Sequence, residues 1–175
     1  MWLRPIQREQ SGPARILTWS ADTGLRNLTI GHGRAASTES GRSLIGRVRL
    51  ESFTDRNGIT LDDESMSQAP VSIEDAFVND VGFQQVVFQY DGAGTLELWS
   101  DNQKMEVAVP ANEGMPISLS SFDATYGFAL GNEFLEGMPH PSEAPAAVRV
   151  WFGHIHTLEI YDRALSEPEI EAFLA

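Results

Sequence analysis

Apolar and polar residues alternate with period two in short runs along most of this chain, and Gly, Asp, Asn and Pro separate the runs. Successive side chains of a strand point to opposite faces, so this period is typical of strands with one buried and one solvated face. Short strands joined by tight turns favour an antiparallel sandwich. We expect strands at Ala14–Ala21, Leu25–Gly31, Leu44–Leu50, Phe83–Tyr90, Thr95–Ser100, Met105–Val109, Tyr126–Gly131 and Val148–Tyr161.

Turn-forming residues separate several of these runs. Asp22-Thr23-Gly24, Asp91-Gly92-Ala93-Gly94 and Asp101-Asn102-Gln103 each consist mainly of residue types that tolerate turn geometry. Each of them is therefore expected to connect two neighbouring strands. Two stretches without a period, Thr54–Asn79 and Asn132–Ala147, are predicted to be long loops.

One segment near the end of the chain has a helical pattern. Ser166 is a favourable N-cap residue, and Glu169 stands three positions later, as in a capping box. Ile170, Phe173 and Leu174 then form one apolar face. Because so short a helix is marginal alone, we expect this face to dock onto the sandwich.

The length of 175 residues is sufficient for one domain, residues 1–175, with a substantial core and no stabilising metal or disulfide. The chain has no cysteine, which excludes thiol catalysis and thiolate zinc sites. No segment has the apolar length of a transmembrane helix, and the first residues lack the pattern of a signal peptide. We expect a soluble domain, either complete or one module of a larger protein.

The formal net charge of −13 is unevenly distributed along the chain. Residues 1–56 contain nine Lys and Arg against five Asp and Glu, whereas residues 57–175 contain three against twenty. Most of the protein would repel a phosphate backbone, so we do not expect nucleic acid as a partner. The acidic surface would attract cations, and it also favours solubility.

The sequence GHIHTLEIYDRALSEPEIEAFL, residues Gly153–Leu174, has a Gly that opens a strand and a Tyr-Asp-Arg-Ala-Leu-Ser stretch that leads into a helix. It resembles the closing signature of laminin-G-like jelly-roll domains, in the concanavalin A-like lectin/glucanase superfamily. VVFQYDGAGTLELWSDNQK, residues Val86–Lys104, is similar to a hairpin of the family. RILTWSADTGLRNLTIGHG, residues Arg15–Gly33, and FALGNE, residues Phe128–Glu133, resemble a bacterial subgroup. The resemblance implies an all-β antiparallel jelly-roll β-sandwich with a short C-terminal helix.

This superfamily contains lectins, glucanases and protein-binding modules, so the fold alone does not decide the function. We expect a non-catalytic recognition module that binds carbohydrate and serves an exported or surface-associated bacterial protein. The alternative is a protein-interaction or structural module without a glycan site, and a weaker alternative is a divergent glycosidase.

Catalysis by paired carboxylates has little support in the sequence. A retaining glycosidase needs two carboxylates about 5 Å apart, which this superfamily commonly places at alternate positions of one strand. Glu97, Glu106 and Glu159 have no acidic residue at the second position after them. We therefore expect that the chain is not an enzyme and has no catalytic residues.

The residue types of the chain suggest two kinds of metal site. His154 and His156 lie two apart and would share one face of a regular strand, where they could either bind zinc or simply face solvent. The family resemblance implies calcium instead, bound at the rim of the sandwich by carboxylate and amide oxygens. The candidate ligands are Asp22, Asp91, Asp101, Asn102, Asn132 and Glu133, each of which could equally be a turn residue.

Sugar sites usually combine an aromatic platform with polar groups that form hydrogen bonds. Trp99, on the same strand face as Glu97, is the candidate platform, although a Trp on a sandwich strand can also belong to the core. Arg47 and Arg49 alternate with apolar residues, so both guanidinium groups are expected on one face, where they could bind an acidic sugar or a protein carboxylate.

Overall fold

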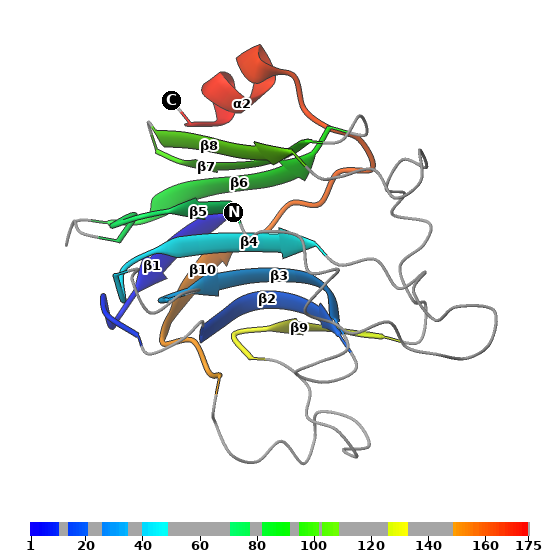
Figure 1. Ribbon diagram of the computed structural model, residues 1–175. Coiled ribbons are helices and arrows are strands. Elements are labelled where there is room, and N and C mark those ends of the chain that lie inside the picture. The colour runs from blue at the N-terminus through cyan, green and yellow to red at the C-terminus, as the bar shows by residue number, and fades with distance from the viewer. Residues whose placement is uncertain are drawn as a thin grey trace, which may run out of the picture.

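The fold is given by a computed structural model, which describes residues 1–10, 14–20, 26–34, 40–48, 71–77, 82–91, 95–101, 103–108, 126–132 and 149–174. In these ranges the chain forms ten strands and one helix. The strands make two antiparallel five-stranded sheets, stacked as a sandwich (Figure 1). The predicted all-β sandwich with a short helix near its end is therefore confirmed.

Sheet A has the strand order β10-β1-β6-β7-β8. Its strands are β1 (Trp2–Pro5), β6 (Gln84–Tyr90), β7 (Thr95–Ser100), β8 (Gln103–Ala108) and β10 (Gly153–Thr157). The first and last of the described strands are neighbours, with Leu3 opposite Ile155. The expected connections after Tyr90 and after Ser100 are confirmed, because β6 pairs with β7 and β7 pairs with β8.

Sheet B has the order β5-β4-β3-β2-β9. Its strands are β2 (Ala14–Ser20), β3 (Arg26–His32), β4 (Leu44–Val48), β5 (Val71–Ile73) and β9 (Gly127–Leu130). The predicted strands for β2, β3, β4 and β9 agree within one or two residues at the ends that the structure describes.

Three differences from the sequence prediction concern short strands. β5 lies inside the stretch Thr54–Asn79 that was predicted to be a loop, and β1 was not predicted. The predicted strand Val148–Tyr161 is wrong in length, because β10 covers only Gly153–Thr157. Its partner β1 has four residues, and the ladder ends where that partner ends. Strands this short leave too few residues to establish a period.

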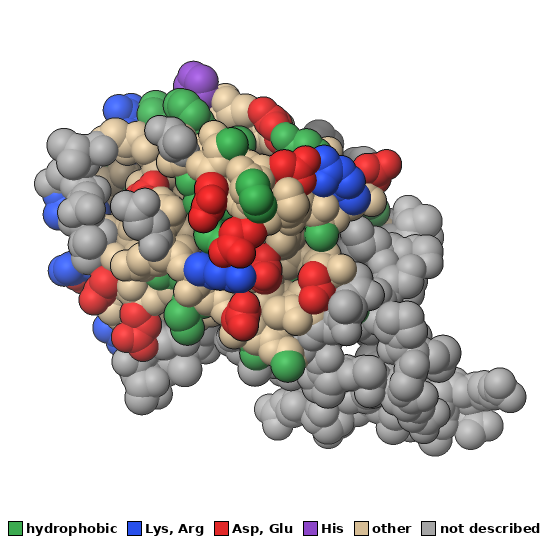
Figure 2. All heavy atoms as spheres, turned by 90° about the horizontal axis from the view of Figure 1, so that it is seen from above, with side chains coloured by type: hydrophobic (Ala, Val, Ile, Leu, Met, Phe, Trp, Pro, Cys, Tyr) green, Lys and Arg blue, Asp and Glu red, His purple; other side chains and the backbone are tan. Residues whose placement is uncertain are grey.

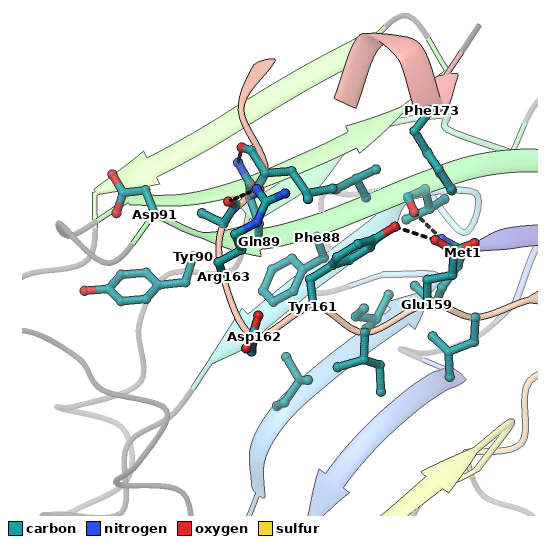
Figure 3. Close-up of a pocket in the computed structure, with 18 of the residues that line it drawn as sticks. Met1, Phe88, Gln89, Tyr90, Asp91, Glu159, Tyr161, Asp162, Arg163 and Phe173 are labelled. Atoms are coloured by element: carbon teal, nitrogen blue, oxygen red, sulfur yellow. Dashed lines mark hydrogen bonds between the residues drawn. The ribbon is translucent and has the colours of Figure 1, made fainter. Parts of the chain in front are cut away.

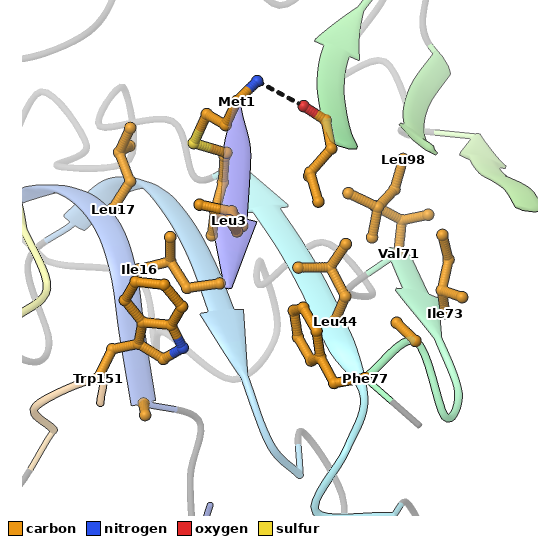
Figure 4. Packing of buried hydrophobic residues seen from close by; sticks show 14 of the residues in the cluster. Met1, Leu3, Ile16, Leu17, Leu44, Val71, Ile73, Phe77, Leu98 and Trp151 are labelled. Atoms are coloured by element: carbon orange, nitrogen blue, oxygen red, sulfur yellow. Dashed lines mark hydrogen bonds between the residues drawn. The ribbon is translucent and has the colours of Figure 1, made fainter. Parts of the chain in front are cut away.

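The core lies between the two sheets (Figure 4). Leu3, Leu96 and Leu98 of sheet A and Leu44 of sheet B are fully buried there. At β4 the two sheets approach closely, because a Cβ atom at Gly46 would overlap the Phe88 ring of β6. Glycine at this position therefore allows the aromatic side chain to pack directly against the opposite sheet.

A buried polar cluster connects the N-terminal segment to β3 of sheet B and to Trp151, which precedes β10. The Nε2–H group of His32 donates to the carbonyl of Arg8 at 2.7 Å, so its Nδ1 is the acceptor for Gln10 Nε2 at 2.8 Å and Trp151 Nε1 at 3.2 Å. The His32 ring also lies 4.2 Å from that of Phe77. Burial lowers the pKa of His32 to about 4, although hydrogen bonds to backbone oppose the shift. The histidine is therefore neutral at pH 7.

Helix α2 (Glu167–Leu174) begins directly after Ser166, as predicted. The carboxylate of Glu169 accepts hydrogen bonds from the backbone nitrogen of Ser166 at 2.8 Å and from its Oγ at 2.7 Å. Ile170 is fully buried, which confirms that the apolar face docks. The described part of the chain contains no helix of the length and apolarity needed to cross a membrane.

Candidate functional site

Five side chains gather on the face of sheet A that points away from the core. Leu3 of β1 is buried, so its neighbours Trp2 and Arg4 face outward. On the adjacent strand β10 the exposed residues are His154 and His156, and Phe83 directly precedes β6 on the other side of β1. We call Trp2, Arg4, Phe83, His154 and His156 the aromatic–basic cluster.

Three rings of the aromatic–basic cluster, those of Trp2, His156 and Phe83, are in contact. His156 lies between two aromatic rings, 5.8 Å from the centroid of Trp2 and 5.2 Å from that of Phe83. The guanidinium of Arg4 lies 5.2 Å from the Phe83 centroid, within range of a cation–π interaction. Trp2 and Phe83 each remain 37% exposed. The cluster thus presents aromatic surface next to nitrogen donors, and these are the two components that a recognition site needs.

Sequence reasoning placed the aromatic platform elsewhere. Trp99 is on the outer face of sheet A with Glu97, as expected, but only 7% of it is exposed. The ammonium of Lys104 lies 4.9 Å from the centroid of its ring, and the indole nitrogen donates to Glu97 at 3.3 Å. A sugar stacked on this ring would have to displace Lys104. The sequence signal that could have identified Trp2 is the order Trp-Leu-Arg, because a leucine that points inward places Trp2 and Arg4 together on the outer face.

Glu97 is the centre of a network on this outer face. Its carboxylate accepts hydrogen bonds from Gln89 Nε2 at 2.6 Å and from Trp99, and it forms a salt bridge with Lys104 at 3.1 Å. Burial alone would raise the pKa of Glu97, but the hydrogen bonds from Gln89, Lys104 and Trp99 outweigh burial and hold it below its usual value. A general acid requires the opposite shift.

Glu106 lies directly opposite Glu97 on β8, so two carboxylates do meet across neighbouring strands. A search along single strands could not reveal this pair. Lys104 bridges both carboxylates, at 3.1 Å from Glu97 and 3.3 Å from Glu106. The ammonium compensates their charge, and the arrangement is that of a surface ion-pair network.

Arg47 lies on β4 opposite Thr29, which is itself opposite Thr18 of β2. This row points away from the core, because Ile30, next to Thr29, is a core residue. Thr18 and Thr29 are buried, and Arg47 is half-buried. Within the ranges that the structure describes, the Thr29 hydroxyl has no hydrogen-bond partner. Arg49 lies outside the described residues, so the predicted pairing of the two arginines on one face remains a prediction.

The described calcium candidates do not meet at one point. Asp91 precedes β7 and Asp101 follows it, so six strand residues, about 20 Å, separate them. Asp91 accepts from the Thr95 nitrogen, and Asp101 from the Gln85 nitrogen, which are structural roles at the two turns. Asn132 follows β9 in the other sheet, where its carbonyl accepts from Thr18. Asp22, Asn102 and Glu133 lie outside the described residues.

His154 and His156 do share one face, as expected for a regular strand. Among the residues that the structure describes, no three His, Asp or Glu side chains are close enough together to bind one metal ion. His156 instead contacts the rings of Trp2 and Phe83, and its Nδ1 lies 2.8 Å from the Thr157 hydroxyl.

Comparison with known proteins gives no relative: the sequence matches no family model and no curated protein, and the fold matches no solved structure. The function is therefore inferred from the site.

Proposed function

We propose that this chain is a non-catalytic recognition domain that binds carbohydrate through the aromatic–basic cluster of sheet A. The observation that carries the proposal is the pair of exposed rings, Trp2 and Phe83, beside the guanidinium of Arg4. Aromatic rings offer large, rigid apolar surface for the C–H faces of a sugar, and Arg and His nitrogens can donate to its hydroxyl or carboxylate groups.

The charge distribution supports the same face as the recognition surface. Figure 2, which looks onto the molecule from the side of α2 and β8, shows many acidic side chains across the middle of this face, and the Lys and Arg side chains in the middle and on the right lie beside them. In the aromatic–basic cluster, by contrast, Arg4 and two histidines stand together without a carboxylate among the five residues. A uronic-acid sugar, which is an anion, would meet less repulsion at the cluster than on the acidic face.

The proposal also covers the strand topology, the location of the protein and the calcium ion. The resemblance to laminin-G-like domains favours a concanavalin A-like jelly-roll topology for the two sheets. It also favours an exported or cell-surface protein, of which this chain would be one module, and a calcium ion at the rim. The described candidate ligands lie too far apart for one ion, so a calcium site would depend on Asp22, Asn102 or Glu133.

A protein ligand is the second candidate for the same surface. Trp and Arg are enriched among the residues that dominate protein–protein binding energy, and Trp2 and Arg4 are adjacent in the aromatic–basic cluster. A carbohydrate-binding domain should bind isolated polysaccharides, whereas a protein-binding domain should not.

The test is a glycan array with the purified domain, read in calcium and in a chelator. We expect binding to a defined set of glycans, and we expect Trp2→Ala or Phe83→Ala to weaken it about tenfold, which corresponds to roughly 1.4 kcal/mol. Binding that disappears in the chelator would add calcium to the site.

Phe128→Ala is the matched control, because Phe128 is an aromatic residue of sheet B with a similar exposed fraction, 40%. It should leave glycan binding unchanged, and circular dichroism should confirm that all three variants are folded. Absence of glycan binding in both conditions would refute the proposal and favour the protein-interaction module.

A further inference from the structure

A pocket of about 470 Å³ lies between the two sheets, on the side where the chain passes from β10 to α2 (Figure 3). Residues 158–165 run across it and form part of its wall. This volume is within the range of pockets that hold small organic ligands. The pocket is separate from the aromatic–basic cluster, none of whose five residues line it.

The inner wall of the pocket is apolar and comes from both sheets. Leu28 and Ile30 of β3 and Val48 of β4 line it from sheet B, and Val86 and Phe88 of β6 line it from sheet A. Figure 3 shows the rings of Phe88 and Tyr161 among the side chains that line the pocket. The body of a ligand in this space would therefore be aliphatic or aromatic.

The outer part of the pocket carries acidic groups. Exposed Glu159 and Asp162 both line it, and Glu159 accepts a hydrogen bond from the Tyr161 hydroxyl at 2.5 Å. Asp162 interacts electrostatically with Arg163, but it forms no hydrogen bond or salt bridge with any other described residue. Arg163 also lines the pocket, but its guanidinium makes two contacts with Glu169, at 2.6 and 3.0 Å. The mouth thus has a carboxylate available for a cation.

The wall formed by residues 158–165 is held in place at its far end. The side-chain amide of Gln89 accepts a hydrogen bond from the Leu165 nitrogen at 2.9 Å and donates one to the Leu165 carbonyl at 3.3 Å. Arg163 is tied to α2 through Glu169, and α2 is docked through the buried Ile170. A pocket with a fixed wall is preformed, which reduces the entropy cost of binding.

We propose that this interlayer pocket binds a small apolar or aromatic amine, with the hydrocarbon part between the sheets and the ammonium group at Asp162. The Asp162 carboxylate selects a cation over an anion, and the aromatic rings of Phe88 and Tyr161, which also line the pocket, favour the ammonium further. This site does not depend on carbohydrate binding, so either proposal can fail alone.

The probes are 4-phenylbutylamine, 4-phenylbutanol and 4-phenylbutyrate, which share a phenyl ring on a four-carbon chain and carry a cationic, a neutral and an anionic head group. Binding is measured by NMR titration of the methyl signals of Leu28, Ile30 and Val48. We expect the amine to bind at least tenfold more tightly than the alcohol, and the carboxylate to bind more weakly than either. No methyl shifts with any probe, or equal affinity for all three, would overturn the proposal.

Two variants separate the head-group site from the hydrocarbon site. Asp162→Asn should remove the preference for the amine while binding of the alcohol stays the same. Ala164→Trp adds a large side chain at the pocket wall and should abolish binding of all three probes. Glu171→Gln, which removes an exposed carboxylate of α2 outside the pocket, is the control and should change nothing. An unchanged amine preference in folded Asp162→Asn protein would contradict the assignment.

Discussion

Gly46 is a residue at which the packing of the two sheets leaves no space for a side chain. The space that a Cβ atom at this position would occupy is filled by the ring of Phe88 from the opposite sheet. We expect Gly46→Ala to destabilise the protein by about 1–3 kcal/mol, because the added methyl group must displace the ring. Urea unfolding measures the change.

Gly41→Ala is the control, since a Cβ there would make only ordinary contacts of 3.5 Å or more. Equal losses of unfolding free energy in both variants would show that the approach of Phe88 is not the cause.

His32 makes the stability of the protein depend on pH. Burial lowers its pKa to about 4 from an unfolded value of 6.5, so the unfolded state binds more protons between these values. The neutral histidine contributes fully above pH 6.5, and its contribution is lost as the pH falls toward 4. By pH 4.5 the loss should be about 2–3 kcal/mol.

Urea unfolding of wild type and His32→Gln between pH 4.5 and 7.5 tests this dependence. Glutamine cannot titrate, so the stability difference between wild type and variant should shrink on acidification. Two profiles that run parallel over this range would contradict a buried neutral histidine.

The tryptophans show what sequence could and could not predict about single residues. The alternation in β7 correctly placed Trp99 and Glu97 on one face, because that depends only on a strand period. It could not predict that Lys104 of the next strand covers the indole ring, because this depends on the register between β7 and β8. Trp2 was not predicted as a site residue, because its role depends on neighbours from β10 and from the start of β6.

Among the elements, α2 depends on its first turn. Ser166 interacts with Glu169, and Arg163 lowers the pKa of Glu169 to about 2, with further contributions from the backbone and hydroxyl of Ser166. We expect Ser166→Ala to reduce stability by about 1 kcal/mol and to accelerate hydrogen exchange at the amide of Ile170, which bonds to the Ser166 carbonyl.

Glu171→Gln provides the comparison for this helix, because Glu171 is exposed and lies beyond the first turn. Exchange at Ile170 should stay slow in that variant. Unchanged exchange in Ser166→Ala would mean that docking of Ile170, and not the cap, holds the helix.

Long, regular elements were predictable and short ones were not. β7 was predicted with its observed bounds, and α2 with its observed start, because a period or a cap is contained in a few consecutive residues. β1 and β5 have four and three residues and exist only through pairing with distant strands. The aromatic–basic cluster depends on one of these strands, so the same limit hid the candidate site.

At the scale of the whole molecule, the order of the strands was the part that sequence could not supply. β1 pairs with β10 on one side and with β6 on the other, and therefore connects residues more than eighty positions apart. Nothing in a local pattern specifies such a pairing. The pairing of β1 with β10 and β6 assembles the aromatic–basic cluster. It also holds β10 in place, and β10 leads into residues 158–165, which form part of the wall of the interlayer pocket.

The net charge of −13 also acts on the whole molecule, and it predicts how salt should affect stability. Repulsion among carboxylates destabilises the compact state, and raising NaCl from about 10 mM to about 0.15 M shortens the Debye length from about 30 Å to about 8 Å. Exposed ion pairs such as Arg42–Glu9 lose strength under the same conditions, but each contributes at most about 1 kcal/mol. We therefore expect Tm at pH 7.5 to rise by a few degrees with NaCl.

The same salt series near pH 4.5, close to the isoelectric point, should change Tm very little because the net charge is then near zero. KCl should reproduce the NaCl result. A Tm that falls with salt at pH 7.5 would show that ion pairs, and not net repulsion, dominate the electrostatic energy of this fold.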